Sequence, residues 1–393
     1  MAAPRIAALT GIRAVAALAV CVTHAAYWTG HYTDDVAGRL WARFEVGVPI
    51  LFVLSGYLLF SPWVRALADG SPAPSLGRYL WHRARRILPA YWITVLAVYA
   101  IFLVYRPPDA SPAGTGWSGL WRNLTLTQVY GAGHLHAGLT QMWSLAAEVL
   151  FYLVLPPIAW LLCTGVCRRR WEPGLLLIAM TPLLMVSPVY TALVAGDTGI
   201  DPTARLWAPA FFEWFAAGMM LAVFVRIRAW PSAWVSVPVA VAAFLVSGSA
   251  VAGEPTIAPS TVSATVVKHL LYTVVALGLI GPLTRPGPRG WWARLCGSRP
   301  MLWCGEISYE FFLVHVMVLE AVMDVLGFPV FTGSLPAALA LTVAISVPVA
   351  WVLHRITAPL WRSPAPRVVA ARRAGSSTAE DCLRYRGAHG DRR

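Results

Sequence analysis

The sequence predicts an all-α polytopic membrane protein, a bundle of about ten transmembrane helices with both the N- and C-termini in the cytoplasm. Composition predicts the class, because 58% of the 393 residues are hydrophobic and only 12% are charged, and the mean hydropathy is +0.62. A soluble domain has about a quarter of its residues charged. Besides composition and hydropathy, the position of the basic residues predicts this class, because most of them lie between apolar runs rather than inside them.

Ten apolar stretches are long enough to cross a bilayer, whose hydrocarbon core takes about 20 helical residues. Some contain proline, which packed membrane bundles tolerate. The first stretch is expected to be an uncleaved helix and not a signal peptide, because Arg13 interrupts it and nine further stretches follow. The predicted spans are 6–28, 46–62, 87–105, 141–162, 173–195, 207–225, 233–249, 266–283, 301–326 and 335–360.

The basic residues predict the orientation of these spans. With a cytoplasmic N-terminus, all but six of the 31 basic residues fall on the cytoplasmic side, where positive charge accumulates in membrane proteins. The six on the outside are Arg39, Arg43, Arg106, Arg122, Arg205 and Lys268. We expect residues 1–362 to form one transmembrane domain, 106–140 to be a long outer loop without helix, and 363–393 to be a disordered basic tail in the cytoplasm.

The net charge of +13 does not indicate a nucleic-acid partner, because the arginines do not form one basic face with interleaved aromatic residues. The expected surroundings are instead the lipid bilayer. The six cysteines include no CxxC pair and no Cys/His cluster with zinc spacing, so we expect reduced thiols and no metal site.

Arg13 and His24 are ionisable residues within the first predicted span, where such groups are expensive and commonly functional. Eleven residues turn a helix about 20° beyond three full turns, so both side chains lie on one face, roughly 16.5 Å apart along the axis. A snorkelling arginine and a hydrogen-bonded histidine would also explain the pair.

Arg83 and Arg86 belong to the basic run RYLWHRARRILPAYW (78–92), which is expected just ahead of the helix 87–105 on the cytoplasmic side. Arginines one turn apart can bind a phosphorylated ligand through bidentate, charge-assisted hydrogen bonds. They can equally anchor the orientation of the helix, which is the commoner use of arginines beside a membrane.

Glu148 and His315 are further ionisable residues in the outer halves of their predicted helices. Ser144 shares a helix face with Glu148, and Trp143 lies next to it in sequence. Glu148 is expected to have a buried partner, as a general base, as an orienter of a histidine or within a structural polar network. His24, Glu148 and His315 are predicted to converge at one depth from three helices.

Five segments in this order resemble the acyltransferase-3 family of multi-pass membrane O-acyltransferases, over roughly residues 5 to 360. The similar segments are LTGIRAVAALAVCVTH (9–24), VGVPILFVLSGYLL (46–59), RARRILPAYW (83–92), MWSLAAEVLFYL (142–153) and ISYEFFLVH (307–315). Val149 stands where many family members have a second acid after the glutamate, so Glu148 alone carries that role in this chain.

The resemblance implies a function and a set of roles. The family acylates hydroxyl groups of envelope glycans, glycolipids and macrolides. This implies a bacterial plasma-membrane enzyme that uses acyl-CoA, with acetyl-CoA the expected donor, as a co-substrate and has no permanently bound cofactor. It implies that His24 is the general base or an acyl relay, assisted by Glu148. The residues implied for acyl-CoA binding are Arg13, Arg83 and Arg86, and those implied to line the cavity are Ser55, Trp143, Ser144 and His315.

A proton-coupled transporter or flippase is the alternative function, because a buried proton relay would use the same histidines and Glu148. We see no inverted repeat, the usual sequence sign of a transporter. Acceptor-dependent release of free CoA distinguishes the two functions.

Overall fold

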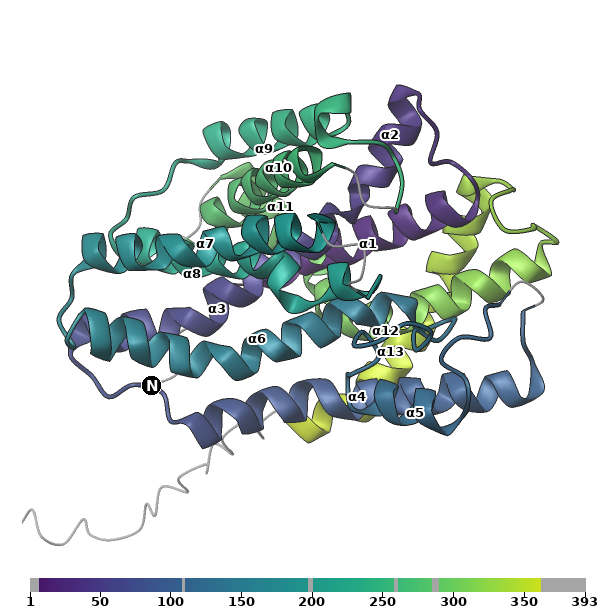
Figure 1. Cartoon of the computed structure of the whole chain (residues 1–393), viewed down its shortest axis with the longest axis horizontal. Coiled ribbons are helices and arrows are strands. Elements are labelled where there is room, and N and C mark those ends of the chain that lie inside the picture. Colours follow the sequence, from purple (N-terminus) through teal and green to yellow (C-terminus); the bar gives the residue numbers. More distant parts are fainter. Residues whose placement is uncertain (1–6, 108–109, 197–200, 258–260, 285–289, 362–393) are drawn as a thin grey trace, which may run out of the picture. The chain divides into compact units, whose positions relative to one another are not determined.

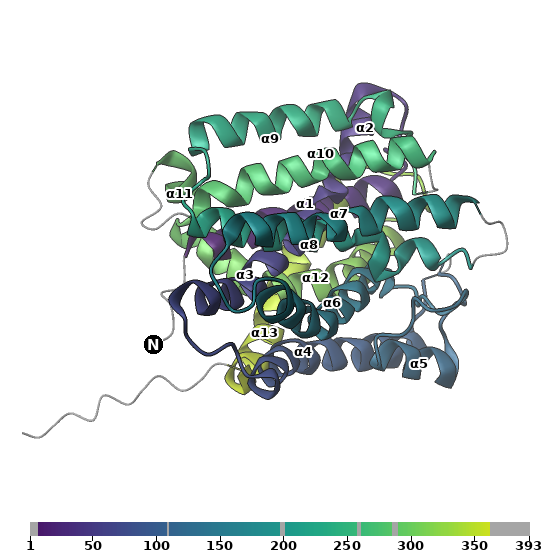
Figure 2. The ribbon, with the colours of Figure 1, turned by 60° about the vertical axis from the view of Figure 1, so that its left-hand side comes forward.

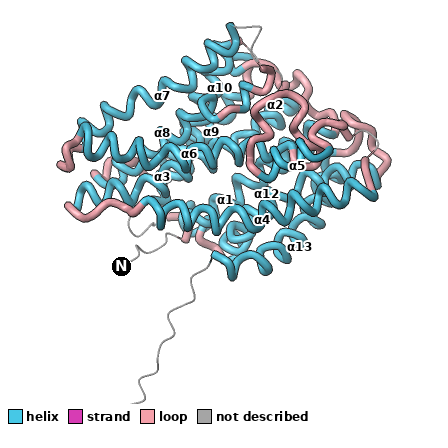
Figure 3. The backbone as a smooth tube through the Cα atoms, turned by 60° about the horizontal axis from the view of Figure 1, so that its bottom comes forward, coloured by secondary structure: helices cyan, strands magenta, loops and turns pink. Residues whose placement is uncertain are grey.

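The computed structural model describes residues 7–361 except 108–109, 197–200, 258–260 and 285–289. In this part of the chain the regular secondary structure is entirely helical (Figures 1 and 3), so the predicted all-α class is confirmed. The long helices are α1 (Ala8–Trp28), α3 (Gly47–Asp69), α4 (Leu76–Val104), α6 (Trp143–Trp160), α7 (Pro173–Gly196), α8 (Phe212–Arg226), α10 (Val262–Ile280), α12 (Arg299–Val325) and α13 (Leu335–Trp361). The short helices are α2 (Val36–Arg43), α5 (Gly116–Leu124), α9 (Ala233–Ser247) and α11 (Trp291–Cys296). The predicted tail 363–393 lies outside the described residues, and the cytoplasmic placement of the termini stays a prediction.

Nine of the ten predicted spans form helical segments long and apolar enough to cross a membrane, within the described residues. The tenth, predicted at 233–249, forms α9, whose 15 residues reach only about 22 Å. Helix α9 lies alongside α10 (Figure 2). A Cβ on Gly278 of α10 would lie 2.7 Å from the Ser236 carbonyl oxygen, so the glycine permits this close approach.

Helix α4 begins at Leu76 and not at residue 87, so the prediction that the basic run precedes the helix was wrong. Leucine, arginine and alanine are strong helix formers, and they extend the apolar helix toward its N-terminus. Pro89 lies inside the helix and does not begin it. The consequence is that Arg83 and Arg86 project from a helix, one turn apart.

The predicted outer loop 106–140 contains the short helix α5, so the expectation of a loop without helix was wrong. Trp117 and Trp121 of α5 are exposed, whereas Gly119 and Asn123 are buried. The hydroxyl of Tyr91 in α4 donates a hydrogen bond to the Asn123 carbonyl and fastens α5 to the bundle. Exposed tryptophans on one side of a short helix are typical of a membrane interface.

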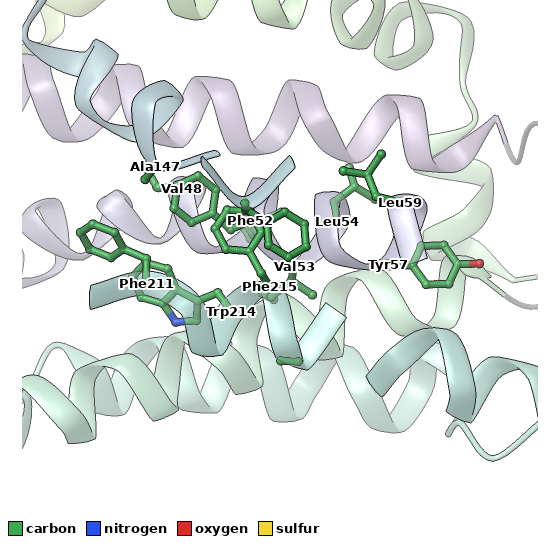
Figure 4. Packing of buried hydrophobic residues seen from close by; sticks show 14 of the residues in the cluster. Val48, Phe52, Val53, Leu54, Tyr57, Leu59, Ala147, Phe211, Trp214 and Phe215 are labelled. Atoms are coloured by element: carbon green, nitrogen blue, oxygen red, sulfur yellow. The ribbon is translucent and has the colours of Figure 1, made fainter. Parts of the chain in front are cut away.

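Helix α1 occupies the interior of the helical body and contacts α3, α12 and α13. Of its most apolar window, 67% is buried in protein, against 11% for α7. The α3–α8 interface beside it contains a buried aromatic core, in which the ring of Phe52 stacks on Phe215 at 4.4 Å (Figure 4). A Cβ on Gly56 would lie 2.2 Å from the Phe215 carbonyl oxygen, which shows how closely these two helices pack. Side chains on α1 are therefore held by protein on most sides.

Candidate active site

Arg13 and His24 both lie on α1, as predicted, and each side chain is half-buried although α1 is an interior helix. Small residues next to them in the helix, such as Gly11, Ala16 and Ala17, are buried against neighbouring helices. The two ionisable side chains therefore lie where the packing of the bundle leaves some surface accessible.

His24 and His315 form a direct pair between α1 and α12. Nδ1 of His24 lies 2.8 Å from Nε2 of His315, and the two ring centroids are 5.1 Å apart with the planes at 22°. Nδ1 of His315 lies 2.8 Å from the carbonyl oxygen of Phe312. The His315 ring is completely buried, whereas His24 retains exposed surface. Two of the three residues predicted to converge are thus in contact.

Glu148 has different partners, which corrects the expectation that it joins the histidines. Its Oε1 accepts hydrogen bonds from the Ser55 hydroxyl and from the Tyr152 hydroxyl, both at 2.5 Å. Within the described residues, none of the hydrogen bonds of Glu148 is to a histidine. Glu148 bonds across to Ser55 on α3 and interacts electrostatically with Arg13, which lies about three turns from His24 along α1, so Glu148 does not share the position of the histidines.

Arg13 belongs to the same polar region as Glu148. It interacts electrostatically with Glu148 and Tyr152 on α6 and with Arg83 and Arg86 on α4. Three arginines predicted to bind one ligand therefore come together from two helices, with Glu148 near Arg13 and Glu310 near Arg86. We call these four residues (Arg13, Arg83, Arg86 and Glu148) the arginine cluster.

The neighbouring Arg85 faces the end of α13 and not the arginine cluster. Its Nε donates a hydrogen bond of 2.6 Å to the carbonyl oxygen of Leu360. The guanidinium of Arg86 lies over the Trp361 ring, 4.4 Å from its centroid. The C-terminal turn of α13 therefore packs against the basic face of α4, and it covers one side of Arg86.

Trp143 and Ser144 begin α6, but neither bonds to Glu148. The Trp143 ring packs on Phe211 with centroids 4.8 Å apart, and the Ser144 hydroxyl donates to the Gln141 carbonyl oxygen at 3.1 Å. Ser55, predicted as a cavity-lining residue, donates a hydrogen bond to Glu148. Sequence reasoning missed Tyr152, although its position four residues after Glu148 on one helix could have indicated it.

Two further histidines inside the bundle were also missed. His269 on α10 lies 3.0 Å from the carboxylate of Glu213 on α8, and His354 on α13 lies 3.0 Å from that of Glu310 on α12. All four residues are buried. His354 follows a long apolar run, whereas His269 lies near the start of α10 directly after Lys268, and only the tertiary structure shows which carboxylate each meets.

The described residues offer no cluster of three His, Cys, Asp or Glu side chains that could hold a metal ion. The five described cysteines are free thiols, and Cys382 lies outside the described residues. The polar groups available for chemistry are thus the histidine pair and the arginine cluster, which lie toward opposite ends of α1.

With this geometry in view, residues 6–355 match the sequence pattern of an acyltransferase domain, that of the acyltransferase-3 family. The chain belongs to the acyltransferase-3 family. The matched residues include both the histidine pair and the arginine cluster. As a member of this family with several membrane-spanning helices, the chain is a multi-pass membrane enzyme that transfers acyl groups.

Similar curated proteins come from three bacteria. The chain is 28% identical to Acyltransferase MdmB of Streptomyces mycarofaciens, covering 80% of this chain and 79% of that protein. It is 25% identical to Peptidoglycan O-acetyltransferase OatA of Listeria monocytogenes, covering 81% of this chain and 50% of that protein. It is 27% identical to Exopolysaccharide production protein ExoZ of Rhizobium meliloti, covering 51% and 55%. No solved structure matches the chain.

Proposed function

We propose that the chain is a bacterial plasma-membrane O-acyltransferase that moves an acyl group, acetyl in the simplest case, from acyl-CoA to an acceptor hydroxyl. The acceptor would be a carbohydrate, glycolipid or macrolide-type molecule. One observation carries the proposal: a half-buried histidine, held by a buried second histidine, lies on the same interior helix as an arginine of the arginine cluster. The name of the relative peptidoglycan O-acetyltransferase supports a hydroxyl acceptor on a glycan.

The arginine cluster is the proposed docking place of the acyl-CoA phosphates. Arg83 and Arg86 lie on the side of the bundle that the charge distribution predicts to be cytoplasmic, where acyl-CoA is found. Guanidinium groups bind phosphate through paired, charge-assisted hydrogen bonds. Arg13, farther along α1, would accompany the pantetheine arm as it extends toward His24.

Glu148 is proposed to act within the arginine cluster and not as the base. Its Oε1 already accepts two hydroxyl hydrogen bonds, from Ser55 and Tyr152, and it interacts electrostatically with Arg13. A carboxylate held in this way compensates the positive charge of neighbouring arginines while no ligand is bound. It would keep the guanidinium groups oriented for the incoming phosphates.

His24 is the proposed catalytic residue. The acceptor oxygen attacks the thioester carbonyl carbon while His24 removes the hydroxyl proton; the new ester C–O bond forms, the C–S bond breaks, and the proton passes to the CoA sulfur. In the second route, His24 attacks the thioester first and then transfers the acyl group to the hydroxyl. Both routes yield one ester and one free CoA thiol, and surrounding helices that exclude water favour both over hydrolysis.

The test is acyl transfer by the purified protein in lipid nanodiscs, measured as release of free CoA from labelled acetyl-CoA and as label on the acceptor. We expect His24→Ala to lower kcat by about 10²- to 10⁴-fold, the range of general acid–base catalysis. The matched control is His31→Ala, because His31 follows the same helix and bonds to Thr29; its kcat should stay close to that of the unaltered protein. Near-normal turnover by His24→Ala overturns the proposed function.

A further inference from the structure

The directions of two hydrogen bonds in the histidine pair can be assigned from the nature of their acceptors. Nδ1 of His315 lies 2.8 Å from the carbonyl oxygen of Phe312, one turn earlier in α12. A carbonyl oxygen accepts hydrogen bonds and cannot donate them. The hydrogen of this bond therefore belongs to Nδ1 of His315.

The second bond follows from the first. A neutral imidazole has one N–H group, so His315, protonated on Nδ1, presents a lone pair at Nε2. That nitrogen lies 2.8 Å from Nδ1 of His24, which must then be the donor. With its single hydrogen on Nδ1, neutral His24 has its free lone pair on Nε2, at the far side of the ring from His315.

We propose that His315 is a positioning residue that holds His24 in the Nδ1–H tautomer, so that Nε2 of His24 is the atom that takes the hydroxyl proton or the acyl group. The inference rests on the proposed function for the role of His24. It assigns to His315 a task distinct from lining a cavity and distinct from proton transfer.

The surroundings of His315 suit this task. Its ring is fully buried and lies parallel to that of Phe311, with centroids 5.8 Å apart and planes at 8°. The His24 ring lies at the Nε2 edge of His315, with centroids 5.1 Å apart. An aromatic ring packed in this way and bonded to its own helix cannot turn to offer its other nitrogen without losing the bond to Phe312. The hydrogen-bond acceptor of His24, which is Nε2 of His315, is thus fixed in place.

The reaction itself strengthens the bond between the two histidines. When Nε2 of His24 gains a proton or an acyl group, the ring becomes positively charged, and its Nδ1–H becomes a charged donor to His315. Charge-assisted hydrogen bonds are roughly twice as strong as neutral ones. An interaction that is stronger in the transition state than in the ground state accelerates the chemical step without tightening substrate binding.

A spectroscopic test reads the tautomer without any substrate. The protein is prepared with histidine labelled with ¹⁵N only at Nδ1, and the His24 signal is identified in nanodiscs by its loss in His24→Gln. We expect a protonated Nδ1 for His24 at neutral pH in the unaltered protein. A His24 signal from an unprotonated Nδ1 overturns the inference, whatever the activity of any variant.

Variants of His315 provide the kinetic test. His315→Leu removes the acceptor, and we expect kcat to fall about 10²-fold or more while KM for acetyl-CoA changes by less than about threefold, because a wrong tautomer disables the base and spares binding. His315→Gln retains a carbonyl oxygen as hydrogen-bond acceptor. We expect its kcat to be at least about tenfold higher than that of His315→Leu, and the protonated Nδ1 signal of His24 to return. The matched control His31→Leu should leave kcat unchanged.

The outcomes separate this inference from the proposed function. An inactive His24→Ala together with a His315→Leu protein of normal kcat overturns the inference alone. Normal turnover by His24→Ala overturns the proposed function, and the Nδ1 signal of the unaltered protein still decides the tautomer. Should His315→Leu fail to fold, His315→Gln and the spectrum of the unaltered protein retain the test.

Discussion

Three histidines deep in the helical body have side-chain partners of two kinds. His269 and His354 each contact a carboxylate, that of Glu213 and that of Glu310, at 3.0 Å. His24 contacts another histidine, whose remaining ring nitrogen bonds to a backbone carbonyl. The first two pairs are buried on both sides, whereas His24 keeps part of its surface accessible.

The difference shows what distinguishes a reactive histidine from a structural one in this bundle. A buried histidine–carboxylate pair joins two helices, and removing either partner leaves a costly unpaired group. A histidine held by a neutral acceptor is itself neutral at rest, so its other ring nitrogen keeps a lone pair that can take a proton. All three histidines lie within candidate membrane-spanning helices, so the partner and the exposure carry the functional information.

The largest expected effect comes from breaking a carboxylate pair. His269→Leu leaves Glu213 buried without its partner, and we expect the free energy of unfolding to fall by about 3–5 kcal/mol. The double variant Glu213→Leu/His269→Leu should recover most of that loss, because no unpaired group remains. Thermal unfolding in detergent measures both, with His24→Ala as the contrasting variant that loses turnover but little stability. Equal melting temperatures for His269→Leu and the unaltered protein would show that this pair is not structural.

Variants of the arginine cluster should weaken the binding of acetyl-CoA, whereas variants of the histidine pair should slow the chemical step. Arg83→Gln is expected to raise KM for acetyl-CoA by about tenfold, equivalent to about 1.4 kcal/mol of binding, with kcat nearly unchanged. Glu148→Gln is the matched control from the same cluster: its amide oxygen can still accept from Ser55 and Tyr152, so kcat should stay within about threefold. If Glu148→Gln instead lowered kcat by about 10²-fold, Glu148 would be the general base.

The smallest expected effect concerns a histidine outside the membrane-spanning helices. His136 is buried between the rings of Tyr99 and Phe102, at 4.4 and 4.6 Å, and burial lowers its pKa below the ordinary value. In the unfolded loop His136 gains a proton as the pH falls below about 6.5, while in the folded loop it stays neutral. Stability of the loop therefore falls with decreasing pH, by at most about 1.4 kcal/mol per pH unit.

Limited proteolysis of the loop between α4 and α6 at pH 8 and pH 5 measures this effect. We expect faster cleavage at pH 5, and His136→Phe, which keeps a ring between the two aromatic side chains, should remove most of the pH dependence. An unchanged pH dependence in His136→Phe would assign the effect to another group.

The physics of the bilayer explains which features could be predicted from sequence. A backbone in lipid must satisfy its hydrogen bonds within the helix, so long apolar runs predict helices directly. The first span was predicted at 6–28, and the observed helix is Ala8–Trp28. The last was predicted at 335–360, and the observed helix is Leu335–Trp361. The errors arose where lipid imposes no such constraint, at the polar start of α4 and in the outer loop that contains α5.

The sequence by itself determined the helical membrane class and placed Arg13 and His24 on one face of one helix, because spacing along a helix is a local property. It could not determine partners, since contacts between helices depend on how each helix is rotated and packed. Only the tertiary structure decided that His315 meets His24 while Glu148 turns to Ser55 and Tyr152. A rotation of α6 about its axis would leave the hydropathy of the chain unchanged and would give Glu148 different neighbours.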